Sequence, residues 1–449
     1  MFRFSYSILL NSSISVNPAY LFRFTVAACL AGIAAGLAGT LSATTLHFAQ
    51  HLAYDYSLGE LVGRESFLTG VINAGAIRRL IVLCVCGLVA GGGWWALHRF
   101  GSPRVSIASA LASPAPRMPV LTTTWHAFLQ IVTVGLGSPL GREVAPRELS
   151  ALAATKIVRS AGLTPPDAHM IVAAAAAAGL AAVYNVPLGG AILALEVLLK
   201  TFGRRAIATA LIICTIAALV AQIGLGDEVQ YKIQPVHPTL SMLALSAIAG
   251  PILGAAGYWF ARLTGEAKAA APTGKMQFFL CVLNFAVIGL LSMAYPALLG
   301  NGKSAAQLGF DGTLAIGSVA MLLVLRIAVT ASSLRAGAHG GVLAPALAVG
   351  SLGGILIAFA WNAYMPAVTL GALAVVGATA FLASSMTMPL TAIVLMAELS
   401  HMNYEMLFPV VIAVAGSTGV SVFYKSRNAS NRSFQIEGRV AEGRVPNTQ

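Results

Sequence analysis

GREVAP at residues 141–146 places a glycine, an arginine and a glutamate inside an otherwise apolar part of the chain. A related interruption, GVLAP at residues 341–345, follows 200 positions later. After each interruption, at nearly the same distance, comes a proline with a glutamate nine residues further on, at residues 187–196 and at residues 389–398. Matching spacings of this kind are typical of a duplicated unit whose side chains have diverged. The sequence therefore predicts two related halves that meet around the two loops.

The composition indicates a membrane protein. Of 449 residues, 57% are hydrophobic and only 9% are charged, whereas about a quarter of the residues in soluble domains carry charge. Runs of about 20 apolar residues, enough for a helix to cross a hydrocarbon core of ~30 Å, recur along the chain. Transmembrane β-barrels give weak alternating patterns instead. We expect an all-α, polytopic membrane protein and no catalytic function.

The basic charge indicates topology rather than a nucleic-acid partner. The formal net charge is +12, but Lys and Arg residues do not form one stripe with interleaved aromatic residues. They cluster at the ends of apolar segments, as at Arg78 and Arg79, and in the tail after Lys425. This distribution is typical of the positive-inside rule and predicts a cytoplasmic C-terminus. Membrane lipid is an expected partner, and no nucleic acid is expected.

The segment pattern predicts one membrane domain with short ends. We expect an N-terminal cytoplasmic segment at 1–24, a transmembrane domain at 25–424 and a basic cytoplasmic tail at 425–449. Within the domain, the first repeat covers about 25–225 and the second about 238–424. No removed signal peptide is expected. The five cysteines lie in apolar runs, which indicates neither disulfides nor a metal site, and no cofactor motif is present.

The two loops predict an anion site. Irregular backbone at membrane depth persists only where it is buried in protein or lines a wet cavity. Helices that begin at such breaks present amide groups with partial positive charge, which favours anions. Arg142-Glu143 and Val342-Leu343 stand at the starts of two such half-helices. We expect both to point toward one ion near the midplane, between the repeats.

Glu143 is the unusual residue in this site. A carboxylate in a buried anion pocket competes with the anion for the same positive potential, so protonation or movement of Glu143 would open the path. The alternative interpretation is an ion pair between Glu143 and Arg142 or Arg147 at a helix end. Residues Glu196 and Glu398 are better explained by helix packing or backbone hydrogen bonds than by proton transfer.

At this point the motifs resemble a known family, the CLC chloride channels and chloride/proton antiporters, over about residues 25–424. Residues 141–143 look like the start of its G-R-E-G-P loop, residues 341–345 like its G-x-F-x-P loop, and residues 101–103 like a shortened G-S-G-I-P. Residues 184–188 (Tyr-Asn-Val-Pro-Leu) match a further signature. The resemblance comes from several motifs in the same order.

The resemblance implies a homodimer in which each subunit has its own anion pathway, built from two inverted-topology repeats of many tilted and broken helices. Glu143 would be the gating glutamate, and no cofactor is implied. The anion-binding residues carried over by position are Ser102, Gly141, Arg142, Val342 and Leu343. For Ser102, a plain helix cap is the alternative. Fluoride-exporting members usually carry Met at this position, so chloride or a similar small anion is the expected substrate.

Two positions depart from the antiporters of this family. Val197 stands where they carry an inner, proton-passing glutamate, and the adjacent Glu196 would point about 100° away around a helix. The family's pore tyrosine has no clear counterpart. Tyr424 is a weak candidate, and Ser430 falls nearer the expected place.

These observations favour chloride transport through a CLC-type pathway gated by Glu143, channel-like or weakly proton-coupled. A chloride/proton antiporter is the alternative, with protons as a second substrate. A membrane-embedded enzyme is less favoured because we find neither a nucleophile with a general base nor an H-E-x-x-H pattern. The expected location is a multi-pass position in a membrane, the plasma (inner) membrane if the protein is bacterial.

Overall fold

The described part of the chain is helical, which confirms the predicted all-α fold. The computed structural model describes residues 17–54, 66–113, 115–227 and 229–441. The helices of the first half are α1 (Pro18–Tyr54), α2 (Phe67–Asn73), α3 (Ala76–Phe100), α4 (Ile107–Ala112), α5 (Val120–Gly135), α6 (Val144–Ser160), α7 (Pro165–Tyr184), α8 (Pro187–Leu193), the π-helix η1 (Ala194–Leu199) and α9 (Arg204–Leu225).

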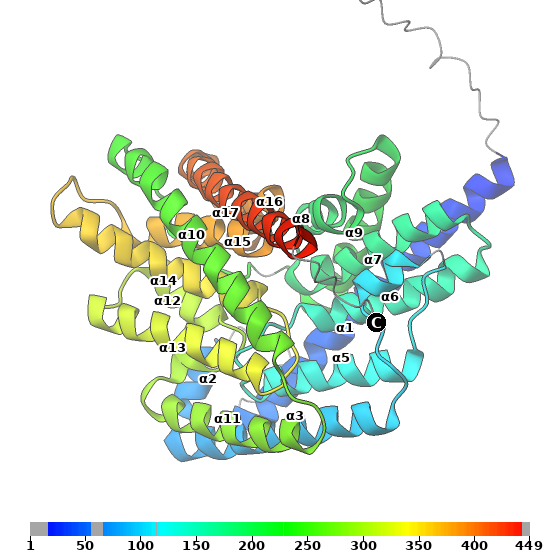
Figure 1. Cartoon of the computed structure of the whole chain (residues 1–449), viewed down its shortest axis with the longest axis horizontal. Helices are drawn as coiled ribbons and strands as arrows, with labels where there is room; N and C mark the ends of the chain where they lie inside the picture. Colours follow the sequence, from blue (N-terminus) through cyan, green and yellow to red (C-terminus); the bar gives the residue numbers. More distant parts are fainter. Residues whose placement is uncertain (1–16, 55–65, 114, 228, 442–449) are drawn as a thin grey trace, which may run out of the picture.

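The helices of the second half follow the same scheme of long and broken helices. They are α10 (Leu240–Ala269), α11 (Lys275–Ala294), the 3-10 turn η2 (Pro296–Leu298), α12 (Lys303–Asp311), α13 (Ile316–Arg335), α14 (Leu343–Asn362), α15 (Leu370–Met386), α16 (Pro389–Ser400), the 3-10 turn η3 (Tyr404–Met406) and α17 (Leu407–Ala441). In Figure 1, α1, α6, α7 and α9 lie on one side of the molecule and α10, α13, α14 and α17 on the other.

Nine helices in the described ranges are long and apolar enough to cross a membrane. They also turn large apolar side chains outward, for example Leu37 (59% exposed) in α1 and Ile223 (88% exposed) in α9. Such outward-facing residues are costly in water and favourable against lipid. The chain is therefore a multi-pass integral membrane protein.

Matching turns in the two halves follow from matching sequence. The helices α7 and α15 both end at a residue in the left-handed conformation, Asn185 (φ 54°) and Thr387 (φ 56°). Two residues later a proline begins the next short helix, at Pro187 and at Pro389. Proline suits the first helical position because it lacks the N–H that this position leaves without an intrahelical acceptor. Local chemistry thus repeats the same broken-helix geometry in each half.

Small residues let the central helices approach closely. Ala173 to Ala178 of α7 are all fully buried. A Cβ on Gly179 would lie 2.4 Å from the carbonyl oxygen of Pro146, so α6 and α7 pack with backbone nearly against backbone. Close packing of small residues is the usual way in which membrane helices associate. It fixes α6, which begins directly after the predicted residue Glu143.

The ends of the expected domain differ from the ends of the helices. The first helix begins at Pro18, seven residues before the expected boundary at 25, and α17 continues through the expected boundary at 424 to Ala441. Residues 425–441 contain no proline. The change to polar sequence therefore marks a change in composition and not the end of the helix.

Candidate functional site

The two predicted loops meet through their glycines. The N–H of Gly141 donates to the carbonyl of Gly341 at 2.7 Å, and the N–H of Gly341 donates back to the carbonyl of Gly141 at 2.9 Å. A Cβ on Gly141 would lie 2.1 Å from one carboxylate oxygen of Glu143, and a Cβ on Gly341 would lie 1.9 Å from the other. The Glu143 carboxylate therefore fills a space that exists only because both residues are glycine.

Glu143 sits at the start of the helix in the opposite half. Its Oε1 accepts a hydrogen bond of 2.8 Å from the N–H of Leu343, the first residue of α14. Glu143 is only 2% exposed, and its Oε2 has no hydrogen-bond partner among the described residues. The N-terminus of α14 carries partial positive charge, which favours an anion at this point. The carboxylate thus takes the place that a small anion would take.

The alternative interpretation, an ion pair of Glu143 with a neighbouring arginine, does not occur among the described residues. The guanidinium of Arg142 instead lies over the ring of Tyr184, 4.9 Å from its centroid, and donates to Gln230 at 3.4 Å. Lys303 donates to the same Gln230 oxygen at 3.4 Å. Two cations therefore lie next to one side of the site, where they attract anions.

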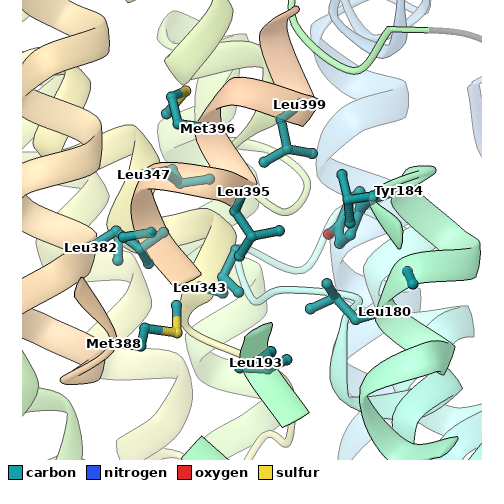
Figure 2. Close-up of a cluster of buried hydrophobic side chains, with 14 of the residues drawn as sticks. Leu180, Tyr184, Leu193, Leu343, Leu347, Leu382, Met388, Leu395, Met396 and Leu399 are labelled. Atoms are coloured by element: carbon teal, nitrogen blue, oxygen red, sulfur yellow. The ribbon is translucent and has the colours of Figure 1, made fainter. Parts of the chain in front are cut away.

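A small cavity borders the start of α14. Its volume is about 10 Å³, room for roughly one water molecule. Its lining includes Leu343 of α14, Leu395 of α16, Tyr184 of α7 and Lys303 of α12. Figure 2 shows the Leu395 side chain between the Leu343 and Tyr184 side chains. Apolar side chains thus leave little open space beside the amide that Glu143 occupies.

Ser102 lies at the junction of α3 and α5. It is exposed, and its hydroxyl is 2.7 Å from the Thr122 hydroxyl, which also donates to the Ser102 carbonyl at 3.2 Å. The alternative role as a helix cap is wrong, because Ser106 caps α4 by accepting from the N–H of Ser109 at 3.1 Å. The anion-binding role of Ser102 stays a prediction.

Glu196 and Glu398 bind backbone, as the sequence favoured. Glu196 accepts from the N–H groups of Leu390 (3.0 Å) and Thr391 (2.8 Å) at the start of α16. Glu398 of α16 accepts from those of Leu188 (2.9 Å) and Gly189 (2.6 Å) at the start of α8. Each carboxylate thus caps the helix of the opposite half.

The other two positions named from the sequence lie in packed surroundings. Val197 is half-buried in η1 and packs against the main apolar core. The ring of Tyr424 stacks on Tyr258 of α10, with centroids 5.2 Å apart, and also contacts Trp259. The structure brings Tyr424 to α10, and none of its ring contacts is with Glu143 or Leu343. Val342, the residue before α14, is half-buried, and its anion-binding role stays a prediction.

The sequence reasoning missed two buried polar groups near the site. Arg326 of α13 is fully buried and donates to three carbonyls, those of Pro139 (3.0 Å), Leu298 (2.9 Å) and Gly300 (3.0 Å). Glu148 of α6, 2% exposed, pairs with His126 of α5. The available signal was the same for both: an ionisable residue inside an apolar segment, which by default indicates a function.

A family model described as voltage gated chloride channel matches residues 86–422. The chain belongs to this family. The match confirms the resemblance to CLC proteins that the motifs indicated, and it makes the chain a member of a family of transport proteins and not of enzymes. Since Gly141, Glu143 and the loop at 341–345 all lie within the matched range, the candidate site belongs to the part that the family shares.

Relatives among characterised proteins match over most of their length. The H(+)/Cl(-) exchange transporter ClcA of Cronobacter sakazakii is 29% identical over 421 residues, which cover 88% of this chain and 86% of that protein. The H(+)/Cl(-) exchange transporter ClcA of Vibrio cholerae is 29% identical over 406 residues, 86% of this chain and 84% of that protein.

Solved structures confirm the CLC fold. A slow cyanobacterial Cl-/H+ antiporter matches with a TM-score of 0.75 at 20% identity, covering 89% of this chain and 94% of that one. A CLC-type fluoride/proton antiporter matches with a TM-score of 0.65 at 18% identity, covering 89% and 95%. The shared architecture extends over nearly the whole membrane domain.

Proposed function

We propose that this CLC protein exchanges chloride for protons across the membrane. The relatives that match over most of the chain are named H(+)/Cl(-) exchange transporters, which favours the exchanger over the channel-like transport that Val197 suggested. The observation that carries the proposal is the hydrogen bond from the Leu343 N–H to the Glu143 carboxylate. The position at the Leu343 N–H can bind either a chloride ion or the Glu143 carboxylate, and that carboxylate can bind a proton.

The chemistry of Glu143 couples the two ions. As a carboxylate, Glu143 accepts from Leu343 and excludes a chloride ion from the same amide, because two negative charges in one small buried site repel. As a carboxylic acid it is neutral, loses most of its attraction to the start of α14 and leaves the amide to chloride. Binding of a proton to Glu143 thus permits the entry of chloride, and the carboxylate and the chloride ion alternate at one position.

The surroundings suit this exchange. Arg142 and Lys303 attract chloride to one side of the site, and Ser102 offers a hydroxyl at the other end of the pathway. The homodimer implied by the resemblance, and contact of the basic tail with anionic lipid, are parts of the same proposal. Each subunit contains its own Glu143 and Leu343, so each would transport independently.

The test is transport by the purified protein in liposomes. Vesicles loaded with chloride are diluted into low-chloride medium, the voltage is clamped with a potassium ionophore, and external chloride and pH are recorded together. An exchanger takes protons up as chloride leaves, so the external pH rises. Chloride release with no proton movement would show a channel-like pathway instead. Absence of chloride release would contradict the proposed transport function.

A further inference from the structure

Glu148 is the centre of a buried polar cluster on the side of α6 that faces α5. Its carboxylate is 2.8 Å from Nδ1 of His126 and accepts from Nε2 of Gln130 at 3.1 Å. The guanidinium of Arg104 donates to its other oxygen at 3.1 Å. Glu148, His126 and Gln130 are each no more than 2% exposed. A carboxylate this deep in a membrane protein is costly to bury, and such residues by default indicate a function.

The cluster extends to the surface through histidines. The ring of His339 lies 5.0 Å from that of His126 and 6.0 Å from that of His98, measured between centroids. His98 is exposed at the end of α3, and His339 is half-buried. Three imidazole rings therefore form a series from the surface to Glu148.

Several cations lie at this end of the molecule. The cluster lies where α3 ends and α5 begins, the end at which Ser102 is bonded to Thr122. Arg99 and Lys268 are exposed near the same helix ends, and Arg104 is 29% exposed in its side chain. An excess of Lys and Arg marks the cytoplasmic side of a membrane protein. A cytoplasmic position of this end is part of the proposal below, and protons that enter through His98 would then come from the cytoplasm.

Glu148 also lies near the proposed gate. It follows Glu143 by five residues, a rise of about 7.5 Å and a turn of about 140° along a helix. Arg147, between them in sequence, interacts electrostatically with both carboxylates. His339 precedes Gly341 by two residues, and Gly341 flanks the Glu143 carboxylate. Arg147 and the loop at 339–341 therefore connect the cluster to the surroundings of Glu143.

Two atoms of the cluster are incompletely bonded. Nε2 of His126 and Oε1 of Gln130 are buried and have no hydrogen-bond partner among the described residues. Buried polar atoms in folded proteins usually have a hydrogen-bond partner, so the two exceptions mark this cluster as a candidate for function. Nδ1 of His126 lies 2.8 Å from Glu148 and 2.9 Å from Nε2 of Gln130. In the tautomer with a proton on Nδ1, Nδ1 donates to Glu148, and Nε2 is a second position for a proton. A metal site is not indicated, since no group of three metal-binding side chains suited to an ion occurs in the described ranges.

We propose that the Glu148–His126 pair is the cytoplasmic proton acceptor of the exchange, in place of the acid that is absent at Val197. This inference rests on the proposed function. A proton from the cytoplasm binds Nε2 of His126, and the Nδ1 proton passes to Glu148 across the 2.8 Å hydrogen bond. From Glu148 the proton moves to Glu143 when Glu143 leaves the Leu343 amide. Arg104 holds the Glu148 carboxylate in place between transfers.

The test compares proton and chloride flux in liposomes for wild type and Glu148→Gln. Because glutamine neither takes up nor gives up a proton, we expect the proton-to-chloride ratio to fall roughly 100-fold, the lower range for loss of a positioned acid–base group. Chloride flux continues, which shows that the variant is folded. Glu148→Asp keeps a carboxylate and should restore the ratio, whereas a purely structural role would not distinguish aspartate from glutamine in this way.

His126→Gln is the second variant, and it decides the matter if Glu148→Gln does not fold. It should lower the same ratio while chloride flux continues. The matched control is Glu405→Gln, which breaks a similar pair, His237 with Glu405 at 2.6 Å, where both side chains are exposed. It should leave both fluxes unchanged. An unchanged ratio in the Glu148 and His126 variants would overturn this inference alone, whereas a wild-type protein that moves no protons would overturn the proposed function with it.

Discussion

Glu143 and Leu343 are 200 residues apart in the chain and are joined by a hydrogen bond of 2.8 Å between a carboxylate oxygen and a backbone N–H. This bond connects the first helix after one loop to the first helix after the other. An amide at the start of a helix binds anions of many kinds. Glu143 is in effect an anion tethered to the protein, and it competes with the transported anion for that amide.

Replacing Glu143 with glutamine tests this competition. Glutamine has nearly the same shape but no charge, so its attraction to the start of α14 should be much weaker. We expect chloride flux in liposomes to continue at a rate that no longer changes with pH, and proton uptake to stop. Chloride release and external pH are recorded together over a series of buffers. A pH dependence equal to that of wild type would contradict a gating role for Glu143.

Replacing Gly341 with alanine tests the space that Glu143 occupies. The new Cβ would lie 1.9 Å from a Glu143 oxygen, and the carboxylate, at the end of a flexible side chain, is the group that can move. We expect Glu143 to leave the Leu343 amide, which makes chloride flux less dependent on pH. The control is Gly265→Ala in α10, where an added Cβ meets nothing within 4 Å. Flux with the wild-type pH dependence in the Gly341 variant would contradict the expectation.

The sequence could predict the broken helices because their causes are local. A proline at 187 and one at 389 begin short helices, and the residues two positions earlier, Asn185 and Thr387, take left-handed conformations in the same way in both halves. Glycines 141 and 341 could also be identified from the sequence. The structure gives the reason for them, because only glycine leaves room for the Glu143 side chain. The glycines and prolines at such breaks keep their spacing in the two halves although the other residues have diverged.

Pairings between distant helices could not be predicted. The contact of His126 with Glu148 joins two helices that face each other only after folding. Neither segment carries a sequence pattern that predicts the other as its partner. The same holds for Ser102, whose hydroxyl contacts Thr122, and for Tyr424, which stacks on Tyr258. Residue type and spacing in the sequence identified the candidate residues. Their contacts depend on how the helices are arranged in the fold.

Arg326 should be a large contributor to stability. Its guanidinium is the donor for carbonyls of Pro139, Leu298 and Gly300, and each buried carbonyl left without a donor costs about 1–3 kcal/mol. We expect Arg326→Met to lower the free energy of unfolding by about 3 kcal/mol or more, seen as a lower thermal unfolding midpoint in detergent. Arg335→Met, at an exposed position of the same helix, is the control. Equal midpoints for the two variants would show that the three bonds contribute little.

Glu196 and Glu398 should have purely structural effects of similar size, with Glu196 also accepting from the Thr391 hydroxyl at 2.6 Å. Each carboxylate accepts from two N–H groups at the start of a helix in the opposite half, and loss of a helix cap costs about 1 kcal/mol. We expect Glu196→Gln and Glu398→Gln each to lower the free energy of unfolding by that amount. Thermal unfolding in detergent measures the change.

Transport by the same two variants separates capping from proton transfer. Because glutamine keeps one acceptor oxygen for the helix start but cannot exchange a proton, a cap predicts an unchanged proton-to-chloride ratio in liposomes. Glu196 is adjacent to Val197, the position where an inner acid was expected, so it is the stricter test. A ratio that falls in Glu196→Gln and stays constant in Glu398→Gln would make Glu196 a proton carrier. Only Glu398 would then be a purely structural cap.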